Sequence, residues 1–369
     1  MNHVIIGGGI AGTTAAEEIR KLDATSNITI VSSEYHALYS RVLLPHYVRG
    51  KVLRERVFLK KEEWYDAQKI EWLHGETVLK IDTKNQCVEL SSGREIPYDK
   101  LLIATGGDVK LIEEDRHGVS YFRTLDDADH LIELLHSCRG VSCLPAGMAR
   151  PSPAASIYGG GFIACEYLNI FHDAGFKTRI AFRGNHMWSR ALSNQAGEII
   201  TNHLITNHVE VVPNVASIET QGEKTIESFS AHGKTFPCSI LGIGVGIQPD
   251  FSFLKGSDIE TNQGILANQF LETSARHVYA IGDVAEFFDE RYGRHIIAGN
   301  WMNAQMQGRL VAKNMLGERN AFNLVSSYAT NTLGLEIIFI GDASRPHADS
   351  SRLIGSVESG GSHGNFCQE

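Results

Sequence analysis

The first twelve residues constrain the fold of this chain more than any other stretch. Residues 4–6 are apolar, residues 7–12 read Gly-Gly-Gly-Ile-Ala-Gly, and residues 13–20 are typical of a helix. This order of strand, glycine turn and helix carries G-x-G-x-x-G spacing, in which the glycines allow a tight turn, close approach of a pyrophosphate, and close packing of helix on strand. The residues predicted to contact a dinucleotide here are Gly7, Gly9, Ile10, Ala11 and Gly12.

A second motif of strand, glycine turn and helix occurs in the middle of the chain. Ser156, Ile157 and Tyr158 precede Gly159. The spacing of Gly159, Gly161 and Ala164 is G-x-G-x-x-A, an accepted variant of the fingerprint. A helical stretch follows through residue 174. The predicted contacts of this second turn are Gly159, Gly161, Phe162 and Ile163.

The residue after the next strand differs between the two copies. Glu34 follows the strand 28–31, and an acid at this place accepts hydrogen bonds from an adenosine ribose. Arg183 stands at the corresponding place of the second copy, where an arginine accommodates the 2′-phosphate of NADP. This favours NADPH over NADH; the alternative is that Arg183 is a solvated loop residue. Added positive charge is expected from His186 and Arg190.

Three further apolar strands end in small residues, which let a ligand come close to the backbone. One precedes Ala104, Thr105 and Gly106, the second contains Gly244, and the third is followed by Gly282 and Asp283.

Composition excludes several classes of function. The net charge of −9 disfavours nucleic acid and an anionic membrane surface as partners. No apolar run approaches the roughly 20 residues of a membrane helix. Strand signal begins at Val4, so a secretory signal is not expected, and we expect a cytoplasmic protein.

The six cysteines show no C-x-x-C pair and no metal-ligand spacing, so no metal site is predicted. Scattered cysteines of this kind are typical of a reducing compartment. Cys138 and Cys143 lie five residues apart, and the sequence leaves their role open.

Four motifs in order carry a family resemblance: the two fingerprints, Ala104-Thr105-Gly106, and Gly282-Asp283. Together they resemble the two-dinucleotide-binding-domain flavoproteins, also called pyridine nucleotide-disulfide oxidoreductases. The segments Tyr39–Leu44 and Tyr121–Ala128 look like those of NAD(P)H:rubredoxin reductases and of the flavin domain of NADH-dependent nitrite reductases.

The resemblance implies an α/β fold with two Rossmann-like dinucleotide-binding domains, one for FAD and one for NAD(P)H, plus a short C-terminal α+β segment. Residues 1–110 and 243–320 would form the discontinuous FAD-binding domain. Residues 111–242 would form the NAD(P)H-binding domain, and residues 321–369 a short C-terminal interface domain.

The resemblance also implies roles for individual residues. Glu166 would lie near the nicotinamide amide, and His46 stands where several relatives place a lysine near the flavin N5; a plain surface histidine is the alternative. These two are the candidate catalytic residues, although the flavin itself would carry the chemistry. The implied FAD contacts are Gly7, Gly9, Ile10, Ala11, Gly12, Glu34, Arg41, Val78, Ala104, Thr105, Gly106, Gly282 and Asp283. The implied NAD(P)H contacts are Gly159, Gly161, Phe162, Ile163, Glu166, Arg183 and Gly244.

The implied function is an FAD-dependent NAD(P)H oxidoreductase that passes electrons to a small redox protein, such as rubredoxin, or to a partner reductase. One alternative is a flavin-binding signalling or assembly protein with slow NAD(P)H oxidation. Another is an NAD(P)H oxidase or quinone reductase. Residues 40–45 lack the redox cysteines of the family's disulfide reductases, which disfavours dithiol chemistry. Both a monomer and a homodimer are compatible with the sequence.

Overall fold

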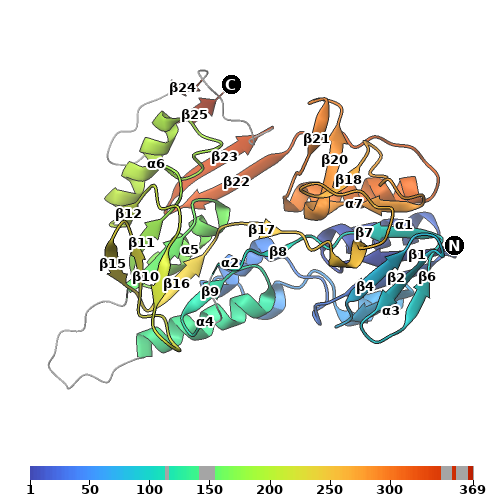
Figure 1. Ribbon diagram of the computed structural model, residues 1–369, viewed down its shortest axis with the longest axis horizontal. Helices are drawn as coiled ribbons and strands as arrows, with labels where there is room; N and C mark the ends of the chain where they lie inside the picture. The colour runs from blue at the N-terminus through green and yellow to red at the C-terminus, as the bar shows by residue number, and fades with distance from the viewer. Residues whose placement is uncertain (113–115, 141–153, 342–350, 355–364, 369) are drawn as a thin grey trace. The chain divides into compact units, whose positions relative to one another are not determined.

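The computed structural model describes residues 1–112, 116–140, 154–341, 351–354 and 365–368, with backbone alone for 139–140 and from 351 onward. The chain forms two compact units (Figure 1). The first unit comprises Met1–Leu43, Leu53–Asp108 and Ile247–Ser326, and the second comprises Leu44–Val52, Val109–Gly246 and Ser327–Glu369. Each unit is built around its own parallel sheet.

The central sheet of the first unit has five strands in the order β19-β7-β1-β2-β3, and all neighbouring pairs are parallel. Ile5 of β1 pairs with Ile30 of β2 on one side and with Leu102 of β7 on the other. The strands are β1 (Asn2–Ile6), β2 (Asn27–Ser32), β3 (Ile70–His74), β7 (Lys100–Ile103) and β19 (Val278–Ala280). Their residues are almost continuously apolar and buried, as expected for a parallel sheet covered on both faces.

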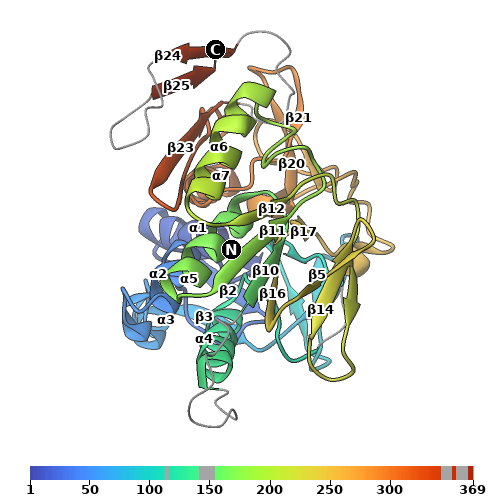
Figure 2. The same ribbon diagram turned by 90° about the vertical axis from the view of Figure 1, so that its left-hand side faces the viewer.

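The second unit repeats this plan with the strand order β12-β11-β10-β16-β9, again parallel throughout (Figure 2). Ile157 of β10 pairs with Ile180 of β11 and with Gly242 of β16. The strands are β9 (Val119–Tyr121), β10 (Ala154–Tyr158), β11 (Lys177–Ala181), β12 (Glu210–Val212) and β16 (Ile240–Ile243). Its helices are α2 (Leu44–Val48), α4 (Leu125–Gly140), α5 (Phe162–Asp173) and α6 (Asn194–Thr206).

In both sheets the order of the strands reverses next to the strand that carries the fingerprint. From β1 the chain passes through a helix to β2 on one side, whereas β7 pairs on the other side; β10 has the same relation to β11 and β16. Ligands of open parallel sheets bind beyond the carboxyl ends of the strands at such a switch point. The expected α/β fold with two Rossmann-like domains is therefore confirmed.

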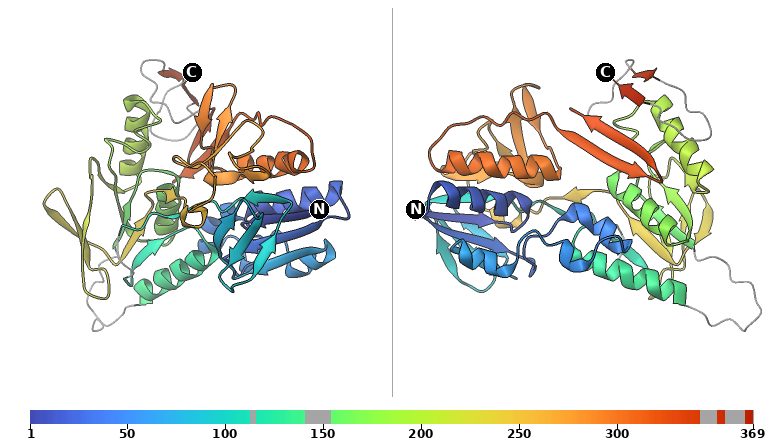
Figure 3. Two further views of the ribbon diagram at one scale, coloured as in Figure 1. Left: turned by 45° about the vertical axis from the view of Figure 1, so that its right-hand side comes forward. Right: turned by 180° about the vertical axis from the view of Figure 1, so that it is seen from behind.

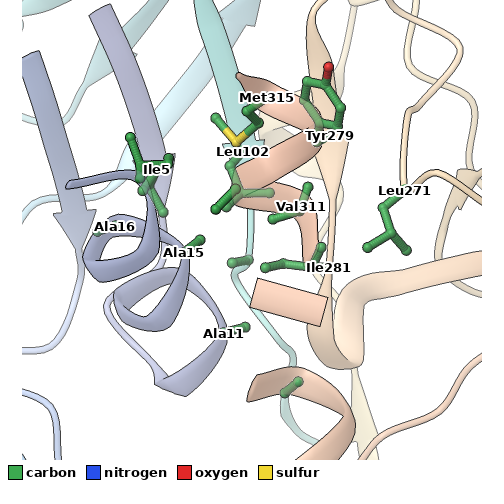
Figure 4. Packing of buried hydrophobic residues seen from close by; sticks show 14 of the residues in the cluster. Ile5, Ala11, Ala15, Ala16, Leu102, Leu271, Tyr279, Ile281, Val311 and Met315 are labelled. Carbon is green, nitrogen blue, oxygen red and sulfur yellow. The ribbon is translucent and has the colours of Figure 1, made fainter. Parts of the chain in front are cut away.

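Two helices of the first unit lie side by side against the sheet, namely α1 (Ile10–Leu22) and α7 (Trp301–Met315) (Figure 3). Gly308 makes their close contact possible, because a Cβ there would lie 2.5 Å from the carbonyl oxygen of Ala11. Ile5, Leu102 and Val311 belong to the buried cluster that joins both helices to the strands (Figure 4).

Smaller elements complete both units. The first unit also contains α3 (Glu62–Ala67), an antiparallel sheet of β4 (Val78–Asp82), β5 (Cys87–Leu90) and β6 (Glu95–Pro97), and a mixed sheet of β18 (Ile265–Ala267), β20 (Ala285–Asp289) and β21 (Arg294–Ile296). The second unit also contains β13 (Glu219–Gln221), β14 (Ser228–Ala231) and β15 (Lys234–Pro237). The short strands β8 (Asp108–Val109) and β17 (Ile247–Gln248) form a separate pair.

The chain after residue 326 belongs to the second unit, where it forms the hairpins β22 (Ser327–Thr332) with β23 (Leu335–Ile340) and β24 (Ser351–Ile354) with β25 (Asn365–Gln368). Buried Asn169 of α5 fastens the first hairpin: its Nδ2 donates to the carbonyl of Asn331 at 2.6 Å, and its Oδ1 accepts from the amide of Leu333 at 2.9 Å. His203 of α6 adds a ring contact of 3.1 Å to the carbonyl of Thr332.

These packing units differ from the predicted domains at several places. Residues 109–110 and 243–246, predicted in the first domain, belong to the second unit, and residues 321–326, predicted in the interface domain, belong to the first. Residues 44–52, predicted within the first domain, pack in the second unit, and the hairpins predicted as a separate interface domain pack there too. The described parts of 321–369 contain strands and no helix. Among the described residues, no helix is both long and apolar enough to cross a bilayer.

Candidate functional site

The first glycine turn lies between two neighbouring strands. Gly7 has a φ of +116°, and a Cβ there would collide with the carbonyl group of Ala104, just past the end of β7. The amide of Gly7 donates to the carbonyl of Val31 in β2 at 2.8 Å. A Cβ at Gly12 would collide with the carbonyl of Gly7, so helix and turn are in contact. Both positions therefore require glycine for the fold itself.

Gly9 differs, because a Cβ there would meet nothing within 4 Å. It precedes α1, and no side chain caps this helix and no acidic residue stands in its first turn. The first amides of α1 are thus available at an open position, which is the arrangement that binds phosphate groups.

Gly282 and Asp283 lie beside this turn. A Cβ at Gly282 would be 3.4 Å from the Cβ of Ala11, and the amide of Gly282 donates to Oε1 of the buried Gln307 at 2.7 Å. A Cβ at Gly299 would lie 3.3 Å from Oδ1 of Asp283. The first and fourth motifs, distant in the sequence, therefore come together.

Two buried donors near Gly282 and Asp283 have no acceptor in the described structure, namely Nδ2 of Asn300 and Nε2 of Gln307. Asn300 also caps α7, since its Oδ1 accepts from the amide of Asn303 at 2.7 Å. Unpaired buried donors are costly unless a ligand supplies acceptors. With the open start of α1, this donor-rich surrounding fits FAD, whose pyrophosphate, ribityl chain and flavin ring are rich in acceptors.

Glu34 lies two residues after β2, as the ribose interpretation requires, but its carboxylate is already engaged. Oε1 accepts from Nη2 of Arg41 at 2.6 Å, and Oε2 accepts from the hydroxyl of Tyr39 at 2.5 Å. Glu34 therefore also orders the Tyr39–Arg41 segment. Val78 lies at the start of β4 with its side chain in the core cluster that contains Val31. Thr105 is exposed and Gly106 is half-buried just after β7.

The second turn reproduces the geometry of the first with different surroundings. Gly159 has a φ of +145°, and a Cβ there would collide with the carbonyl of Gly244, just past β16. Gly161 precedes α5 without a side-chain cap, and a Cβ there would meet nothing within 4 Å. Ala164, at the third fingerprint position, is completely buried.

Aromatic side chains gather at the start of α5. The half-exposed Phe162 stacks on Tyr328 of β22 with ring centroids 5.5 Å apart, and it contacts Trp188 and Phe339 at 5.6 Å each. The amide of Trp188 donates to the carbonyl of Gly160 at 2.9 Å, while its buried Nε1 has no acceptor in the described structure. Ile163 is likewise part-exposed. The open helix start and the unpaired indole donor fit a second acceptor-rich dinucleotide.

Arg183 is exposed two residues after β11, and its charge acts on Tyr158 at the end of β10. It thus lies at the carboxyl edge of the second sheet. The ring of His186 is buried against Gly197 of α6, and its Nδ1 lies 2.8 Å from the carbonyl oxygen of Met187. Arg190 is exposed.

Glu166 and His46 lie in the same unit, on α5 and α2. Burial raises the pKa of Glu166 to about 7, and the nearby Arg49 offsets this only in part. The exposed His46 has its pKa lowered by partial desolvation and by the charges of Arg49 and Lys51, which favours the neutral imidazole. Glu166 can therefore exchange a proton near neutral pH.

The described cysteines Cys87, Cys138, Cys165 and Cys238 are free thiols. Burial raises the pKa of Cys138, which disfavours the reactive thiolate, and Cys143 lies outside the described residues. No group of His, Cys, Asp or Glu in the described ranges could hold a metal ion.

Sequence reasoning missed the residues that complete each site from other elements. In the first unit these are Asn300, Gln307 and Gly308 of the α7 region, and in the second unit Arg49, Asp173, Trp188 and Tyr328. Gly308 was a usable signal, because a glycine inside a helix lowers the stability of that helix unless close packing requires it.

Two parallel sheets, each with a glycine turn and an open helix start at its switch point, define a two-dinucleotide-binding protein. The family model "Pyridine nucleotide-disulphide oxidoreductase" matches residues 1–308. The chain belongs to this family, which confirms the resemblance seen in the motifs, and it is a member of an oxidoreductase family.

Named relatives agree with this assignment. The chain is 27% identical over 346 residues to nitrite reductase [NAD(P)H] of Bacillus subtilis, which covers 92% of the chain and 40% of that protein. It is 27% identical over 340 residues to NADH-rubredoxin oxidoreductase of Clostridium acetobutylicum, covering 92% of the chain and 81% of the relative. In fold it matches the covalent putidaredoxin reductase–putidaredoxin complex with a TM-score of 0.86 at 23% identity, covering 96% and 84% of the two chains. The chain thus spans less than half of the nitrite reductase.

Replacing Gly9 by alanine should separate cofactor binding from folding. The backbone of Gly9 (φ −72°, ψ −173°) accepts any residue, and its Cβ would be free of protein contacts. We expect FAD-free Gly9→Ala to keep the wild-type thermal unfolding midpoint and to bind FAD at least about tenfold more weakly. Gly12→Ala, whose Cβ collides with Gly7, should lower the midpoint as well. Calorimetry and flavin content test this, and a Gly9→Ala protein with native FAD affinity would contradict the site.

The pKa of Glu166 predicts a pH-dependent stability. Its folded-state pKa of about 7 lies above the ordinary 4.5, so the stability linked to the protonated form is complete below about pH 4.5 and is lost as the pH rises through 7. Wild type should lose about 1–3 kcal/mol of its free energy of unfolding when the pH rises from about 5 to about 8.5, and Glu166→Gln should not show this loss. Urea unfolding at both pH values measures it, with exposed Glu198→Gln as control. An equal pH dependence in Glu166→Gln and wild type would refute it.

Proposed function

We propose that this chain is an FAD-dependent NAD(P)H oxidoreductase that passes electrons from a nicotinamide to a small redox protein or a partner reductase. The first unit would hold FAD and the second the nicotinamide dinucleotide. We place the activity in the cytoplasm, in keeping with the free described cysteines.

One observation carries the proposal: each unit has an uncapped helix start behind a glycine turn at its switch point. One such site would suffice for a simple dehydrogenase. Two in one chain suit a reaction between two dinucleotides, and hydride transfer from nicotinamide to flavin is the chemistry of that pair.

The assignment of cofactors to units follows the groups around each turn. Glu34 stands where a ribose acid is expected and Asp283 lies beside the first turn, whereas the second turn has Arg183 and Glu166. Arg183 favours NADPH through its charge at the place of a 2′-phosphate. In this assignment Glu166 binds the carboxamide of the nicotinamide. His46, which belongs to the same unit and whose lowered pKa favours the neutral imidazole, would accept or donate a proton during flavin reduction.

The named relatives support the class of acceptor. Rubredoxin occurs in the name of the clostridial relative, and putidaredoxin is the partner in the matched complex. Nitrite reductase, of which the chain spans 40%, supports a partner reductase as the alternative acceptor.

Anaerobic stopped-flow flavin reduction tests the function. We expect the purified protein to be yellow and its flavin to be bleached by NADPH or NADH faster than about 1 s⁻¹, the lower range of enzyme turnover. Reoxidation should then be fastest with a small iron–sulfur protein. A colourless protein contradicts the proposal, slower bleaching favours a binding or signalling role, and preferential reoxidation by O₂ or a quinone favours the oxidase or quinone reductase alternative.

Arg183→Glu tests the choice of nicotinamide. If Arg183 binds the 2′-phosphate, charge reversal should shift the ratio of kcat/KM for NADPH over NADH toward NADH by about 10–100-fold. Arg190→Glu, which reverses a neighbouring exposed charge, should shift the ratio much less. A wild-type preference for NADH, or an equal shift in both variants, would show that Arg183 does not select the cofactor.

A further inference from the structure

We propose that Asp173 is a positioning residue for the nicotinamide site: by binding Arg49, it leaves the carboxyl group of Glu166 unpaired and available to a neutral amide. The inference rests on the proposed function for the identity of that amide, the carboxamide of a nicotinamide. It assigns a purpose to an ion cluster that neither fingerprint contains.

Glu166 and Asp173 lie on one face of α5, because seven residues make almost two full turns, roughly 10 Å along the helix. The chain segment that contains α2 packs on α4 and α5. The hydroxyl of Tyr47 in α2 donates to Oδ1 of Asp129 in α4 at 2.6 Å, which holds the segment in place. Arg49 follows directly after α2 and is thereby carried to the same face of α5.

Asp173 engages two cations at once. Nε and Nη2 of Arg49 each lie 2.7 Å from Oδ2 of Asp173, and Nζ of Lys51 lies 3.1 Å from the same oxygen. Asp173 is the last residue of α5, where the negative end of the helix dipole disfavours an anion. Arg49 and Lys51 offset this cost, and two nitrogens of the Arg49 guanidinium group are engaged with Asp173.

Glu166 makes no hydrogen bond and no ion pair within the described part of the chain. Arg49 acts on it only through space, as a positive charge that favours its ionised form. A partly buried carboxyl near a cation normally forms an ion pair. The charge of Arg49 thus acts on Glu166, but the guanidinium group of Arg49 pairs with Asp173 instead.

The other ionisable groups of the packed elements leave this picture unchanged. Tyr167 and Cys165 are on α5, as is His172, whose Nδ1 lies 3.9 Å from Oδ1 of Asp173. His46 and Tyr47 are on α2, and Lys51 follows it. The described ionisable side chains of α4 are Asp126, Asp127, Asp129, His130, Glu133, His136 and Cys138. Lys51 is bound to Asp173 and Tyr47 to Asp129. Arg49 is the group whose charge acts on Glu166 among the described residues.

An unpaired carboxyl serves a carboxamide in either protonation state. The protonated form donates to the amide oxygen, and the ionised form accepts from the amide nitrogen. A carboxylate held in a bidentate pair with arginine stays ionised, so it cannot donate to the amide oxygen, and one acceptor site on each oxygen is occupied. Freeing Arg49 should therefore occupy Glu166 and weaken amide binding.

The experiment uses the FAD-loaded protein and follows the carboxyl group of Glu166 by infrared spectroscopy, with the signal assigned by its loss in Glu166→Gln. In Asp173→Asn we expect the titration midpoint of Glu166 to fall by at least about one pH unit. Binding of NAD⁺ or NADP⁺, the oxidised probes that cannot turn over, should weaken about tenfold. Asp173→Glu, which keeps the carboxylate, should retain the wild-type midpoint more closely.

A second pair of variants separates the release of Arg49 from the mere loss of a negative charge. In the Arg49→Met background, Asp173→Asn should no longer lower the midpoint of Glu166, because no arginine is left to pair with it. An equal fall with and without Arg49, or no fall in Asp173→Asn, would overturn the inference.

The titration needs no nicotinamide nucleotide, so the inference and the proposed function can fail separately. A midpoint shift in Asp173→Asn, together with no binding of NAD⁺ or NADP⁺ by the wild type, would contradict the proposed function and the amide ligand but would support the binding of Arg49 by Asp173. Flavin reduction by NAD(P)H without any midpoint shift would overturn the positioning role alone.

Discussion

The structure depends on one backbone contact that occurs twice: a glycine turn pressed against the carbonyl group that follows a neighbouring parallel strand. Gly7 meets Ala104 in the first unit, and Gly159 meets Gly244 in the second. No side chain can stand at the glycine, so turn and strand end can approach closely only with this residue type. The contact fixes the helix start beyond the turn at the switch point of the sheet, where its free amides face a ligand.

The two units share this backbone plan but surround it with different chemistry. Near the first turn the buried side-chain amide groups of Asn300 and Gln307 each have a donor without an acceptor in the described structure, and Asp283 lies close by. The second turn is followed by the aromatic cluster at Phe162 and by Glu166, whose carboxyl group has a pKa of about 7. The same fold thus presents two different ligand environments, which is the basis for assigning FAD to one and a nicotinamide to the other.

The sequence was sufficient wherever a local rule governs the structure. Both turns, the strands beside them and the helices after them follow from residues adjacent in the chain. The sequence was insufficient where a residue contacts segments that are distant in the chain. The approach of Gly308 to Ala11, the capture of the C-terminal hairpin by Asn169, and the packing of residues 44–52 in the second unit depend on contacts between distant segments. The burial of His186 and the environment of Glu166 were hidden for the same reason.

If one chain holds two different dinucleotides at once, the FAD-saturated protein must still bind a nicotinamide dinucleotide, and calorimetric titration with NADP⁺ and NAD⁺ tests this most directly. We predict that one additional nucleotide binds per chain and that the flavin is retained throughout the titration. Displacement of FAD by the nicotinamide dinucleotide, or the absence of any binding to the FAD-saturated protein, would contradict it.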